Sequence, residues 1–148
     1  MFFDEEMLLD LRLNIMDKYV DKFVITEATY MHSGRPKKLL FDINKYSKFK
    51  DKIIYNVIDK EPSNIESIYE EDKDEKDTRG QKLVNNSNKR EHYQRNMAEE
   101  SLKILSEAEP EDIILINDID EIPNLDEINF NRINKKLIFF KQKMFFYK

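Results

Sequence analysis

Two aspartates in the second half of the chain have the spacing of a divalent-metal site. They lie in NDIDEIP at residues 117–123, directly after residues 112–117 (DIILIN), whose leucine and β-branched side chains predict a strand covered on both faces. In extended backbone, residues two apart point to the same side, so Asp118 and Asp120 would project together while Ile119 turns into the core. Two such carboxylates repel each other unless a cation lies between them. Because Mg²⁺ and Mn²⁺ prefer oxygen ligands and complete their shell with substrate phosphates, the pair predicts a metal that bridges the protein to a diphosphate.

The same spacing has a second explanation. The chain has 30 acidic residues, so pairs of neighbouring carboxylates are common in it. Asp118 could instead cap the next helix from a solvated turn. The residues alone leave both explanations open.

Two further polar segments could hold a phosphate or a sugar. Glu27 lies near the end of the strand-like FVITEA, and the loop at residues 29–38 (TYMHSGRPKK) follows with a glycine, cations and hydroxyls. On a long predicted helix, His92, Arg95 and Asn96 share one face because they are three and four residues apart. A Gly-Pro turn with surface lysines and a solvated helix face are the plainer alternatives.

The helices that would position these groups follow from apolar spacing. Leu8, Leu11 and Ile15 predict a helix over residues 5–20 with these three side chains on its apolar face. Tyr93 and Met97 belong to the apolar side of a second helix over residues 88–108. Shorter helical segments are expected at residues 42–49 and 125–131. The charged stretch at residues 69–78 is expected to be a solvated loop, and its continuation to residue 88 is polar too.

The strands follow from short runs of β-branched and aromatic residues. They are expected at residues 22–28, 52–58 and 112–117, with closing strands at residues 136–140 and 144–147. The aromatic residues of the last two segments, Phe139, Phe140, Phe145, Phe146 and Tyr147, are expected in the core. Alternating strands and helices predict one α/β domain over residues 1–148 with a mostly parallel sheet, which binds ligands at the carboxyl ends of its strands.

Composition narrows the function classes. The chain has 148 residues, a formal net charge of −5 and no cysteine, which excludes disulfides, zinc-thiolate sites and cysteine nucleophiles. It has no basic stripe, so no nucleic-acid partner is expected. No apolar run approaches the ~20 residues that span a bilayer, and acids interrupt the apolar start. We therefore expect a soluble, cytoplasmic protein without a membrane span.

Several motifs in a fixed order make the chain similar to a known family. It resembles glycosyltransferase family 17, the β-1,4-mannosyl-glycoprotein 4-β-N-acetylglucosaminyltransferase family. The matching stretches are FFDEEMLLDLRLNIM, VDKFVITEATYMHSGRPKKLLF, FKDKIIYNVID, EHYQRNMAEESL, EDIILINDIDEIP and LIFFKQKMFFYK. The resemblance implies a GT-A-like (Rossmann-like) fold, UDP-N-acetylglucosamine as donor, a Mn²⁺ or Mg²⁺ cofactor, and inverting transfer of N-acetylglucosamine to a glycan acceptor.

The resemblance also assigns roles to residues. Asp118 and Asp120 occupy its metal motif, and Glu121 completes that motif and is expected to help position the sugar. Its position beside the metal also makes Glu121 the candidate catalytic carboxylate. The donor-binding positions are Glu27, Thr29, Gly34, Lys37, Arg95 and Asn96. Glu5, Leu9 and Arg12 match the opening helix, where Leu9 and Arg12 are expected to be structural.

Members of that family continue well beyond the equivalent of Lys148, so three alternatives stay open: a minimal member, a C-terminally truncated fragment or a decayed gene product. A neighbouring chain in a homo-oligomer could supply the missing acceptor side. The alternative is a non-catalytic or fragmentary module that binds a nucleotide sugar without transferring it. A phosphatase-like nucleophile at Asp118 would need supporting Lys and Thr motifs that the sequence lacks.

Overall fold

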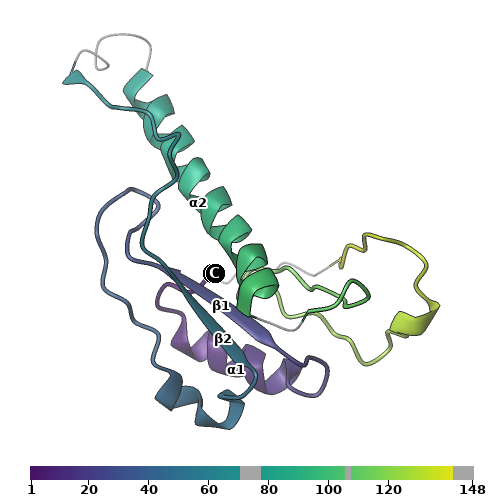
Figure 1. Ribbon diagram of the computed structural model, residues 1–148. Coiled ribbons are helices and arrows are strands. Elements are labelled where there is room, and N and C mark those ends of the chain that lie inside the picture. The colour runs from purple at the N-terminus through teal and green to yellow at the C-terminus, as the bar shows by residue number, and fades with distance from the viewer. Residues whose placement is uncertain (71–77, 106–107, 142–148) are drawn as a thin grey trace, which may run out of the picture.

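The computed structural model describes residues 1–70, 78–105 and 108–141 (Figure 1). The regular elements, in chain order, are α1 (Glu6–Met16), β1 (Phe23–Ala28), η1 (Ile43–Phe49), β2 (Ile53–Ile58), α2 (Thr78–Leu105) and η3 (Phe130–Arg132). The two strands were both expected, and they pair in parallel from Phe23 opposite Ile53 to Ala28 opposite Ile58. The described residues therefore form an α/β structure around a two-stranded parallel sheet.

Alternate residues of β1 face different helices. Phe23 and Ile25 belong to a core cluster with α1, whereas Ala28 belongs to a second cluster against α2. Five of the six residues of β1 are buried, as expected for a parallel strand covered on both faces. The sheet thus holds α1 and α2 in fixed positions relative to the carboxyl end of β1.

The apolar face of α1 differs from the predicted one. Leu9, Leu13 and Met16 are buried, whereas Leu11 and Ile15 are 48% and 41% exposed. Both sets recur every three to four residues, because the segment EMLLDLRLNIM is apolar on more than one side. The periodicity predicted the helix correctly, but only packing against β1 decided which side is buried.

Helix α2 begins earlier than predicted and covers the polar continuation of the expected loop. It starts at Thr78, and its first turns extend away from the sheet beside the segment that follows β2 (Figure 1). Asn86 joins the two, because its side chain accepts a hydrogen bond from Glu66 N and donates one to Glu66 O, both at 2.8 Å. This contact with a distant segment stabilises a polar helix that local sequence does not favour.

The strands predicted after α2 are absent from the described residues. Residues 112–117 form no strand, and Ile113, Ile114 and Ile116 are 61%, 54% and 77% exposed. Residues 136–140 likewise form no strand, and Phe139 is 85% exposed instead of lying in the core. Apolar composition favours burial, but a strand also needs a neighbouring edge with which to pair. The strand expected at residues 144–147, with Phe145, Phe146 and Tyr147, lies outside the described residues, and a GT-A-like sheet stays a prediction.

Candidate functional site

The motif NDIDEIP lies in a hydrogen-bonded turn. Glu121 N donates to Asp118 O at 3.1 Å, and Asp118 N donates to the Glu121 carboxylate at 3.2 Å. The expectation that Asp118 and Asp120 project together from extended backbone is therefore wrong in its premise, because the chain reverses here. Ile119 packs against the core, as predicted.

Arg12 anchors this turn to α1. Its Nη1 donates to Asp118 O and Glu121 O, each at 2.9 Å, and its Nη2 donates to Asn117 Oδ1 at 3.0 Å. Burial lowers the pKa of Arg12, while the carboxylates of Glu121, Asp118 and Asp120 raise it. The expected structural role of Arg12 is thus a specific one, since the guanidinium fixes the acidic turn against the opening helix.

A second arginine reaches the same turn from α2. Arg95 Nη2 lies 2.8 Å from Asp118 Oδ1 and 3.1 Å from Glu91 Oε1. The side chains of Arg95 and Asp118 are 38% and 49% exposed, so solvent reaches this ion pair. Two positions singled out in separate motifs are therefore in direct contact, while Asn96 and Asp120 are exposed.

The turn offers the oxygen ligands that a hard divalent ion prefers. The carboxylates of Asp118 and Asp120 both raise the pKa of the Arg12 guanidinium, and the carboxylate of Asp118 already binds Arg95. These donors fit a Mg²⁺ or Mn²⁺ ion that takes further ligands from a diphosphate. Within the part of the chain that the structure describes, no group of three or more acidic or histidine side chains could enclose a metal.

Glu27 binds four donors at the carboxyl end of β1. Its carboxylate is fully buried and accepts bonds from Leu40 N at 2.8 Å, Phe41 N at 3.0 Å and the Tyr55 hydroxyl at 2.8 Å, and it also pairs with Lys37 Nζ. Burial alone would raise the pKa of Glu27, but these hydrogen bonds outweigh it and lower the pKa below its usual value. The carboxylate therefore ties the loop after β1 to the sheet.

The other expected donor-binding residues of this loop belong to the same bonded unit. Lys37 N donates to Thr29 O at 2.8 Å, and Thr29 N donates to Ile58 O at 3.0 Å. Gly34 turns the loop in the left-handed region, with a φ of 84°. The structure brings Glu27, Thr29 and Lys37 together, with Gly34 in the same loop, and their role toward a donor stays a prediction.

Arg90 is a positioning residue that the sequence reasoning missed. Its Nη1 donates to His32 O at 3.1 Å, and its guanidinium binds Glu61 at 2.8 Å. The guanidinium also lies over Gly34, where an added Cβ would come within 2.6 Å of Arg90 Nη2. No local sequence pattern marks Arg90, because its partners His32 and Glu61 lie far from it in the chain.

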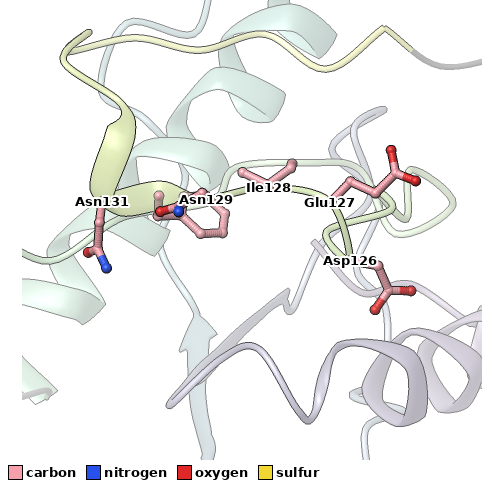
Figure 2. Close-up of a pocket in the computed structure, with 6 residues that line it drawn as sticks. Asp126, Glu127, Ile128, Asn129 and Asn131 are labelled. Atoms are coloured by element: carbon pink, nitrogen blue, oxygen red, sulfur yellow. The ribbon is translucent and has the colours of Figure 1, made fainter.

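A hollow of about 430 Å³ lies elsewhere on the chain (Figure 2). It is lined by Asp126, Glu127, Ile128, Asn129, Phe130 and Asn131. One continuous segment forms the whole lining, so this hollow brings together none of the predicted site residues.

Comparisons with known proteins give one match. The family model described as glycosyltransferase family 17 matches residues 1–148, the whole chain. No curated protein and no solved structure matches. None of the helices in the described part of the chain combines the length and apolar character that crossing a bilayer requires.

Proposed function

The chain belongs to glycosyltransferase family 17, and from that membership we propose that it transfers N-acetylglucosamine from UDP-N-acetylglucosamine to a glycan acceptor. We place the donor diphosphate beside the turn at residues 117–121. The observation that carries this placement is the contact of 2.8 Å between Arg95 and Asp118, which joins two motifs at one point. Arginine and a carboxylate-bound divalent ion are two kinds of group that proteins use to hold phosphates.

In the proposed reaction, an acceptor hydroxyl oxygen forms a bond to the anomeric carbon. The bond from that carbon to the diphosphate oxygen breaks, UDP leaves with the electron pair, and a carboxylate takes the hydroxyl proton. A divalent ion held by Asp118 and Asp120 would neutralise the charge that develops on the leaving diphosphate.

Glu121 is the proposed base for the hydroxyl proton. Its carboxylate accepts a hydrogen bond from Asp118 N at 3.2 Å, and Arg12 binds its backbone carbonyl at 2.9 Å. Both contacts keep the carboxylate next to the metal-binding aspartates while leaving it open to solvent. An acceptor that approaches the sugar from the solvent side would meet it there.

A non-catalytic module that binds a nucleotide sugar is the second candidate. The hollow of Figure 2 contains none of the expected donor-binding residues, so it does not distinguish the two candidates. Donor binding without donor hydrolysis or transfer would support this candidate over the enzyme.

Calorimetric titration of UDP and UDP-N-acetylglucosamine, with Mn²⁺ and with chelator, tests the donor site. We expect Mn²⁺-dependent binding that weakens by at least about tenfold in Asp120→Ala. Asp21→Ala is the matched control, because Asp21 is exposed and precedes β1, at the opposite end of that strand from Glu27. Unchanged affinity in Asp120→Ala would refute the metal site, and no binding by the unaltered chain would refute the donor assignment.

A further inference from the structure

Asp118 already has a positively charged partner. Arg95 Nη2 lies 2.8 Å from Asp118 Oδ1, and the same atom lies 3.1 Å from Glu91 Oε1 one helical turn earlier. Arg95 is thus shared between two carboxylates, one on its own helix and one on the acidic turn. This arrangement lets the guanidinium leave Asp118 and keep a carboxylate partner on α2.

A divalent ion and this guanidinium compete for one carboxylate. A Mg²⁺ or Mn²⁺ ion binds carboxylate oxygens directly, whereas the guanidinium donates hydrogen bonds to the same oxygen, and the two positive charges repel each other. The pair is 38% and 49% exposed, so water can solvate both groups when they separate. Exposed ion pairs are weak, so an ion needs little free energy to displace Arg95.

We infer that Arg95 is a resident counter-ion of Asp118, which a divalent ion displaces, and that the released guanidinium then binds the donor diphosphate. The inference rests on the proposed function, because it assumes a metal at Asp118. Its consequence is coupling between ligands: the ion alone must break the ion pair, whereas the ion together with a diphosphate gives Arg95 a new anionic partner. The metal and the donor therefore each raise the affinity for the other.

Binding of Mn²⁺ alone, followed by electron paramagnetic resonance of the free ion, tests the competition. Arg95→Gln is expected to bind Mn²⁺ about two- to fivefold more tightly than the unaltered chain, from the strength of an exposed ion pair. Saturating UDP should raise the Mn²⁺ affinity of the unaltered chain more than that of Arg95→Gln, after correction for Mn²⁺ bound to free UDP.

Arg79→Gln is the matched control, because it removes the same charge from the same helix. Arg79 lies sixteen residues before Arg95. That separation is about 24 Å along an α-helix, well beyond the screening length of about 8 Å at physiological ionic strength. Its Mn²⁺ affinity should equal that of the unaltered chain.

The outcomes separate this inference from the proposed function. If Asp120→Ala loses Mn²⁺-dependent UDP binding but a folded Arg95→Gln binds Mn²⁺ no more tightly, the inference is wrong and the metal site stands. If the unaltered chain binds no Mn²⁺, both are wrong.

A measurement on the unaltered chain covers the case in which Arg95→Gln does not fold. Magnesium should shift the nuclear magnetic resonance signal of the Arg95 Nε–H, because the guanidinium leaves Asp118. A signal that magnesium leaves unmoved, under conditions where magnesium binds, overturns the inference.

Discussion

Removing the guanidinium of Arg12 should release the acidic turn from α1. Arg12→Gln deletes three hydrogen bonds of 2.9, 2.9 and 3.0 Å to the turn at residues 117–121. A hydrogen bond contributes about 0.5–1.5 kcal/mol net, and Arg12 is only half-buried, so water replaces part of the loss. The free energy that opens the turn should therefore fall by about 1–3 kcal/mol.

Amide hydrogen exchange followed by mass spectrometry measures this opening. Because exchange from a locally opened state follows the opening equilibrium, peptides that span residues 117–121 should exchange about 5- to 150-fold faster. Peptides from β1 should change little, since Arg12 binds the turn and not the sheet. The affinity for Mn²⁺ should fall with the loss of order in the turn.

Arg35→Gln is the control, because it removes an exposed arginine from a different loop. Unchanged exchange at residues 117–121 in Arg12→Gln would refute the anchoring role. Equal acceleration in β1 would refute it too, because that result would mean global destabilisation.

Two further substitutions test the loop after β1. Gly34→Ala should lower the free energy of unfolding in urea by about 1–2 kcal/mol from its φ of 84° alone, and the contact of 2.6 Å with Arg90 adds to this. Gly80→Ala in α2 is its control and should stabilise by up to about 1 kcal/mol, so equal effects at both glycines would contradict the strain argument. Glu27→Gln should cost about 3 kcal/mol at pH 7, because it leaves the buried Lys37 ammonium without its counter-charge. Because the pKa of Glu27 is lowered on folding, its carboxylate stabilises the folded chain above the unfolded pKa of about 4.3, and this stability is lost as the pH falls through the lower folded pKa. The difference in the free energy of unfolding between the unaltered chain and Glu27→Gln should therefore narrow below about pH 4 in urea unfolding. A difference in the free energy of unfolding that stays constant from pH 7 to pH 3 would show that the ionised carboxylate is not the stabilising form.

The donor-binding assignments illustrate the difference between a position and a role. The motif order placed Glu27 and Lys37 in one functional segment, and the structure does bring them together. Their charged groups bind each other, with side-chain exposures of 0% and 6%. A donor phosphate would have to compete with this buried pair for Lys37, which makes Arg95, which reaches the exposed turn from α2, the better-placed cation.

Local sequence determined where several of the regular elements lie. Both strands of the sheet and the helix α1 lie where the apolar pattern predicted them, and the short helix at Ile43–Phe49 lies in a segment that was expected to be helical. The order of several motifs along the chain was enough to indicate the family, which the match over residues 1–148 then confirmed. Each of these features depends on runs of neighbouring residues, so it can be identified from the sequence without the tertiary structure.

Tertiary structure alone decided which groups meet. The buried side of α1 was ambiguous because two sets of residues have helical spacing, and residues 112–117 form no strand because no described strand pairs with them. Arg12 and its partner Asn117 are 105 residues apart in the chain, and Arg90 lies 58 residues from His32. An arginine can bind any carbonyl or carboxylate within reach, so its partner follows from packing of the sheet and helices, which no local pattern specifies.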